Sequence, residues 1–82
     1  MKTNIFLTAI KNRNKLKFLY RLTEIMIEPY YVAREKSGKK VIYGRVKKTN
    51  EIRKFEYNNI SNIRVLNNVK FSPLIPIISQ VS

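Results

Sequence analysis

The chain has 82 residues, with 17 Lys and Arg against five acidic residues, which gives a formal net charge of +12 at pH 7. It contains no His or Cys, and all five acidic residues are Glu, so the usual catalytic triads, general bases and transition-metal sites cannot be assembled from it. We therefore expect a small single domain that is not an enzyme, uses no cofactor or metal, and attracts a polyanion such as nucleic acid, although a merely solvated basic surface is the alternative.

The first predicted element is a helix over residues 3–13, because its apolar residues recur on one helical stripe. A strand follows over residues 15–20, in which apolar and basic residues alternate. Residues 25–34 form a longer predicted strand, where Pro29 has no N–H to donate and requires a bend, a bulge or an edge position. Residues 36–39 are typical of a turn, with Gly38 free to take positive φ.

Two more strands are predicted over residues 41–46 and 51–57, joined by a link in which Asn50 takes any left-handed position. A turn or single helical turn over residues 58–62 and a short strand over residues 63–66 complete the pattern. One helix followed by about five short strands predicts a mainly β fold, α+β by strict count, with a small closed or nearly closed barrel.

Residues 1–73 are expected to form this single domain, and residues 74–82 an apolar tail. The tail either closes the barrel of its own domain or contacts a partner. That partner would be a second copy of the chain in a homodimer, or a larger protein. Apolar stretches are too short for a signal peptide or a membrane span, so we expect a cytoplasmic protein that does not bind membranes.

Strand alternation places aromatic and arginine side chains together. Within 41–46, Tyr43 and Arg45 share one face, and within 51–57, Arg53 shares a face with Phe55 and Tyr57. Such faces can stack bases and hold phosphates, so these five residues are the predicted binding site for nucleic acid or an anionic ligand. Two alternatives remain open: the arginines extend past the rings into solvent, or Arg53 pairs with a glutamate such as Glu28.

The order of the motifs resembles the WYL domain family over residues 5–71. AIKNRNKLKFLY (9–20) is similar to its opening helix and strand, and IEPYYVAREKSGKKVIYG (27–44) to its central segment with a proline and a turn glycine. IRKFEYNNISNIRVL (52–66) resembles its Arg-x-Phe and Ile element, and FSP (71–73) follows where the family often has a Phe. VIY (41–43) stands in place of Trp-Tyr-Leu, and Asn59 replaces an arginine of the family pattern.

The resemblance implies an Sm-like five-stranded barrel behind a helix, here as a stand-alone domain without the winged-helix domain that usually precedes it. It implies a regulatory or accessory role, such as transcription regulation, with Arg53 and Phe55 as the leading site residues and Tyr43 next. The leading hypothesis is a non-enzymatic module that binds single-stranded RNA or DNA. The alternatives are a sensor of a small anionic ligand or nucleotide, and an assembly module that uses the tail.

Overall fold

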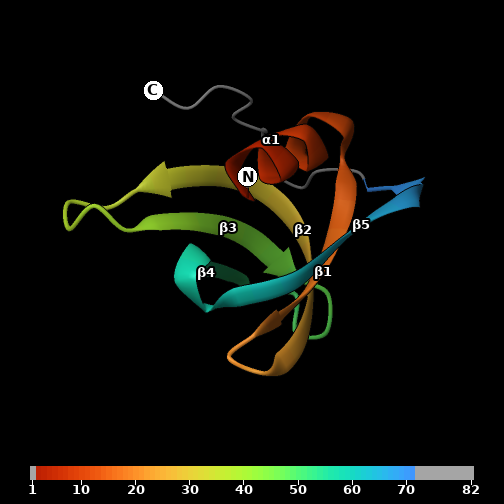
Figure 1. Ribbon diagram of the computed structural model, residues 1–82. Coiled ribbons are helices and arrows are strands. Elements are labelled where there is room, and N and C mark those ends of the chain that lie inside the picture. Colours follow the sequence, from red (N-terminus) through yellow and green to blue (C-terminus); the bar gives the residue numbers. More distant parts are fainter. Residues whose placement is uncertain (1, 72–82) are drawn as a thin grey trace.

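In the computed structural model, which describes residues 2–71, one helix precedes five strands of a single antiparallel sheet (Figure 1). The strand order is β4-β3-β2-β1-β5. The predicted mainly β fold with an N-terminal helix is confirmed, while the predicted tail at 74–82 lies outside the described residues. The elements are α1 (Lys2–Asn12), β1 (Asn14–Tyr20), β2 (Thr23–Arg34), β3 (Lys40–Val46), β4 (Ile52–Glu56), the 3-10 helix η1 (Tyr57–Asn59) and β5 (Ile60–Lys70).

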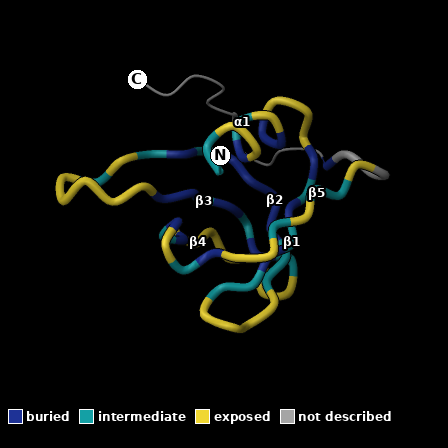
Figure 2. The backbone as a smooth tube through the Cα atoms, viewed as in Figure 1, coloured by how far each residue is buried: buried dark blue, intermediate teal, exposed yellow. Residues whose placement is uncertain are grey.

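Helix α1 lies across the sheet and inserts its apolar stripe into the core. Phe6, Ala9 and Ile10 are buried, and the Phe6 ring meets the Tyr57 ring edge to face at a centroid distance of 5.0 Å. Strand β1 buries alternate residues as its sequence pattern predicted. Figure 2 shows buried backbone running through the middle of β2 and β3, with the tip of their hairpin exposed.

Pro29 lies at a β-bulge in β2, one of the solutions that its missing N–H allowed. The register of β2 against β3 shifts between Pro29 and Tyr31, and Gly44 lies opposite Pro29. A Cβ added at Gly44 would lie 3.0 Å from the Glu28 carbonyl oxygen and 3.1 Å from Ile27 Cβ, so the close approach of the two strands favours glycine there. Gly38 has φ +90° and Asn50 has φ +62°, which confirms both predicted left-handed turn positions.

The sheet curls strongly but is not closed, so the predicted barrel is only approximate. Strands β1 and β4 are separated by two strands, which in a flat sheet would place them about 14 Å apart. Instead the Phe55 ring of β4 lies 5.4 Å from the Phe18 ring and 4.9 Å from the Tyr20 ring of β1, measured between centroids. The Glu56 N–H also donates to the Tyr20 hydroxyl at 3.2 Å. Side chains therefore join the two strands where backbone pairing does not.

Strand β5 is longer than the sequence predicted, since it covers residues 60–70 rather than 63–66. The asparagines that indicated a turn over 58–62 occupy two different places. Asn58 and Asn59 belong to η1, whereas Asn62 lies within β5 at φ +51°. There the register of β5 against β1 shifts between Lys17 and Leu19. Asn62 therefore forms a bulge inside the strand instead of ending it.

Candidate functional site

The five residues of the predicted binding site do not form one surface. In the β3–β4 ladder, Arg45 lies opposite Ile52 and Ile42 lies opposite Phe55. Paired residues of an antiparallel ladder point to the same face, so odd-numbered residues of β3 share a face with even-numbered residues of β4. Tyr43 and Arg45 therefore lie on the face of the sheet opposite to Arg53, Phe55 and Tyr57.

Phe55 lies in the core and presents no ring face to a ligand. Its exposed fraction is 0%, and its ring is enclosed by Phe18 and Tyr20. The Arg53 guanidinium carbon lies 5.0 Å from the Phe55 ring centroid, a cation–π distance. Arg53 itself is exposed, so its binding to a ligand stays a prediction, whereas Phe55 is a core residue.

Arg45 is held by the buried carboxylate of Glu28 on the opposite face. Its Nη2 lies 2.7 Å and its Nε 3.0 Å from Glu28 Oε1, and its Nη1 donates to Asn50 Oδ1 at 2.5 Å. Lys47 Nζ is 3.5 Å from the second carboxylate oxygen of Glu28. The alternative in which Arg53 pairs with Glu28 does not hold, because Glu28 faces Arg45 across the β2–β3 ladder.

Tyr43 forms an aromatic pair on the same face as Arg45. Its ring lies 5.7 Å from the Tyr31 ring across the β2–β3 ladder, and both are half-buried. Lys54, opposite Tyr43 in the ladder, forms an ion pair with Glu35, and that hydrogen bond raises the pKa of the Lys54 ammonium. The cations beside Tyr43 thus have carboxylate partners within the protein.

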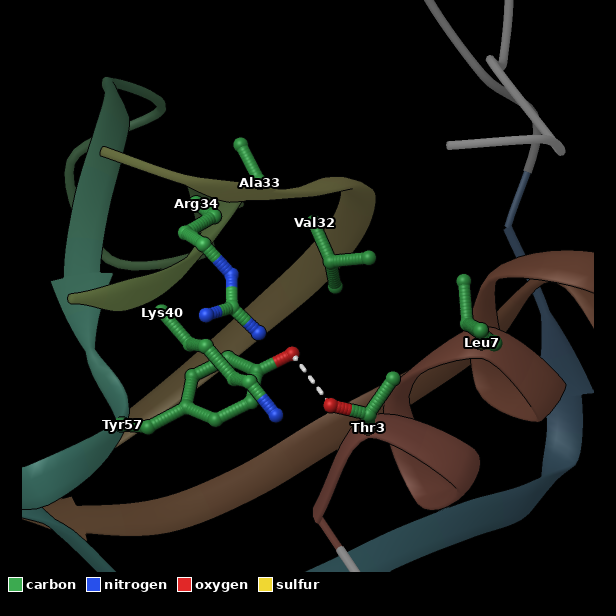
Figure 3. Close-up of a pocket in the computed structure, with 7 residues that line it drawn as sticks. All are labelled: Thr3, Leu7, Val32, Ala33, Arg34, Lys40 and Tyr57. Carbon is green, nitrogen blue, oxygen red and sulfur yellow. Dashed lines mark hydrogen bonds between the residues drawn. The ribbon is translucent and has the colours of Figure 1, made fainter. Parts of the chain in front are cut away.

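Tyr57, in contrast, lines a pocket of about 300 Å³ between α1, η1 and the β2–β3 hairpin. Figure 3 shows the Arg34 guanidinium and the Lys40 ammonium pointing toward the hydroxyl groups of Tyr57 and Thr3. Thr3 donates to the Tyr57 hydroxyl at 3.3 Å, and Lys2 Nζ donates to the Tyr57 carbonyl at 2.7 Å. The other lining residues, Leu7, Val32 and Ala33, are apolar.

Arg34 and Lys40 face each other directly across the β2–β3 ladder. Like charges in opposed positions destabilise a sheet unless another group compensates them. Neither residue takes part in an ion pair among residues 2–71, where the five ion pairs involve Lys17, Lys39, Arg45, Lys47 and Lys54. The pocket therefore carries two positive charges that no carboxylate of the described residues neutralises, an arrangement suited to an anion.

The sequence carried a signal for these two residues, which we did not single out. Arg34 ends one predicted strand, and Lys40 lies immediately before the next, with the turn and Gly38 between them. Basic residues flanking a hairpin turn at equal distance become cross-strand neighbours. Thr3 had no such signal, because its place beside Tyr57 depends on how α1 packs on the sheet.

Burial raises the pKa of the Tyr57 hydroxyl above its usual value, and the hydrogen bond from Thr3 partly offsets that rise. Tyr57 is therefore protonated at neutral pH. Because the Thr3 hydroxyl supplies the hydrogen in their mutual bond, the hydrogen of Tyr57 is left to donate to another acceptor.

Residues 2–71 offer neither a metal site nor a membrane-spanning helix. No group of three or more acidic side chains there could hold a metal ion, and no helix in that range is long and apolar enough to cross a membrane.

The fold matches part of the proteasome accessory factor B/C (PafBC) of Arthrobacter aurescens, with a TM-score of 0.77 and 19% sequence identity. The match covers 87% of this chain and 12% of that one, so this chain corresponds to a small part of the other protein. At this identity the likeness concerns the fold, and it supports the WYL-like fold that the motifs predicted. No family model and no curated protein matches the sequence, so membership of the family stays a prediction.

Proposed function

We propose that this protein is a non-enzymatic module that binds single-stranded nucleic acid, RNA or DNA, in a regulatory or accessory role. The observation that carries the proposal is the pocket lined by Arg34 and Lys40, which have no carboxylate partner in the part of the chain that the structure describes. The net charge of +12 supplies the long-range attraction of a polyanion. The fold match and the resemblance to the WYL family are consistent with this role.

The distribution of unpaired charge favours one face of the sheet over the other as the binding surface for nucleic acid. Four of the five glutamates form ion pairs, and these neutralise cations such as Arg45 and Lys54 on the face that carries Tyr43. Within residues 2–71, Arg34, Lys40 and Arg53 have no carboxylate partner, and they lie on the face that carries α1 or at its margin. We therefore expect the phosphates of a strand to follow the α1 face rather than the Tyr43 face.

The proposal predicts affinity that depends strongly on salt. If three or four phosphates are contacted, the slope of log K against log[salt] is about −2 to −3 for a single strand. Affinity should then fall about 15- to 60-fold between 50 and 200 mM salt. Fluorescence anisotropy with a labelled oligonucleotide measures this directly. Absence of binding at low salt, or an affinity that does not change with salt, would rule out the proposal.

A second function, binding of a small anionic ligand or nucleotide, is favoured by the size of the pocket. A volume of about 300 Å³ lies at the lower end of the range for small-molecule sites, and the apolar wall could hold a base or sugar. Thermal-shift measurements with mononucleotides separate the two functions. Stabilisation by a mononucleotide, combined with failure of longer strands to bind, would favour the sensor.

A further inference from the structure

The pocket of Thr3, Arg34, Lys40 and Tyr57 differs from a groove that follows a phosphate backbone. It is a single hollow of about 300 Å³, whereas grooves for single strands hold roughly four or more nucleotides. We propose that this pocket binds the terminal phosphomonoester of a strand, so that the protein recognises phosphorylated ends. This inference rests on the proposed function and names the part of the strand that the pocket holds.

The first argument is charge. A phosphomonoester carries about −1.5 to −2 charges at pH 7, whereas each internal phosphodiester carries one. Arg34 and Lys40 together supply two positive charges that no carboxylate in residues 2–71 neutralises. A terminal phosphate would therefore balance this pair more completely than an internal one. The guanidinium can bind two of its oxygens at once, and the ammonium can approach as a point charge.

The second argument is the hydrogen-bond donor at the same place. Thr3 donates to the Tyr57 hydroxyl oxygen, and this bond orients the tyrosine. The hydroxyl hydrogen of Tyr57 takes no part in that bond. Lys2 Nζ holds the same residue by donating to its carbonyl oxygen at 2.7 Å. A phosphate oxygen between the cations would meet this hydroxyl, because all three groups point into one space (Figure 3).

The third argument is the shape of the surface on either side of the cations. Apart from Thr3, the lining contributed by α1 and the middle of β2 is apolar, from Leu7 and Val32, and offers no hydrogen-bond donor to a second phosphate. On the other side a neighbouring hollow of about 390 Å³ shares Lys40 and Tyr57. Its remaining lining residues are Gly38 and three polar or basic residues, Ser37, Lys39 and Asn58. A strand would thus end in the first hollow and leave across the second.

The experiment compares strands of one sequence, about ten nucleotides long, that carry an internal fluorophore. The strands have a 5′-phosphate, a 3′-phosphate, hydroxyl groups at both ends, or no ends because they are circular. We expect one of the phosphorylated strands to bind at least tenfold more tightly than the strand with two hydroxyl ends. The circular strand should bind no more tightly than the strand with two hydroxyl ends. Whichever phosphorylated strand binds more tightly shows whether the pocket holds the 5′ or the 3′ end.

Variants assign the preference to the pocket. Arg34→Gln and Lys40→Gln should each remove most of the tenfold difference, and Tyr57→Phe, which keeps the ring, should reduce it. Arg64→Gln and Lys48→Gln remove exposed charges outside the pocket, so these variants should retain the preference for the phosphorylated strand. Circular dichroism shows whether each variant is folded, and Tyr57→Phe provides the test if a charge variant is not.

The possible failures are distinct. Equal affinity for phosphorylated, hydroxyl and circular strands would overturn the inference and leave the proposed function intact. A preference for phosphorylated ends that survives in every folded pocket variant would also overturn it, because the end would then bind elsewhere. If no strand binds at low salt, both the inference and the proposed function fail.

Discussion

Replacing Phe55 with alanine is expected to lower the free energy of unfolding by about 3–5 kcal/mol, the usual cost of removing a buried phenylalanine ring. The ring has an exposed fraction of 0% and joins β4 to Phe18 and Tyr20 of β1, where no backbone pairing connects the two strands. A domain of this size has only about 5–15 kcal/mol of stability in total. Urea denaturation followed by circular dichroism should therefore show a variant that is marginally folded or unfolded.

Phe55→Leu is the matched control for this prediction. It keeps most of the apolar volume, so it should fold with a smaller loss of stability and bind a labelled strand as the unaltered protein does. A folded Phe55→Leu variant with at least tenfold weaker binding would show that the ring contacts the ligand. That result would contradict the position of Phe55 in the core.

Glu28→Gln is expected to reduce the free energy of unfolding by about 3 kcal/mol, because it leaves a partly buried arginine without its counter-charge. Glu28 is only 3% exposed, and its carboxylate binds both Arg45 and Lys47. Urea denaturation of the variant measures the loss.

Glu24→Gln provides the comparison, since it removes the same charge from an exposed pair. Glu24 lies 3.6 Å from Lys17 with 65% of its side chain exposed, and such pairs contribute at most about 1 kcal/mol. Equal losses for the two variants would contradict a structural role for the Glu28 cluster.

Much of the fold follows from local patterns in the sequence. The apolar stripe of residues 3–13 predicted α1, and alternation predicted β1 to β4 within a few residues. Pro29 predicted an irregularity in β2, which the structure resolves as a bulge. The length of β5 was missed because Asn62 was interpreted as part of a turn, whereas the curled sheet accommodates it as a bulge within the strand.

The site was harder to predict because it depends on how neighbouring strands are paired. Alternation correctly grouped residues within each strand, but it does not say which group of β3 shares a face with which group of β4. The pairing of Arg45 with Ile52 decides this and separates Tyr43 from Arg53. Burial of Phe55 depends on the curl of the sheet toward β1, and the contact between Thr3 and Tyr57 depends on the packing of α1. Neither the burial of Phe55 nor the Thr3–Tyr57 contact can be predicted from the sequence of a single strand.

The most direct test of the account is the salt dependence of strand binding in two matched double variants. Arg34→Gln with Lys40→Gln removes the cations of the pocket, and Arg64→Gln with Lys48→Gln removes the same two residue types elsewhere. We predict that, for a strand with a terminal phosphate, the first pair weakens binding at least tenfold at low salt. It should also reduce the steepness of the salt dependence by about 1.4, because the two negative charges of that phosphate are no longer neutralised, at roughly 0.7 per charge. The second pair should change both quantities little. Equal losses in the two double variants, or no loss in the first, would contradict a phosphate site at Arg34 and Lys40.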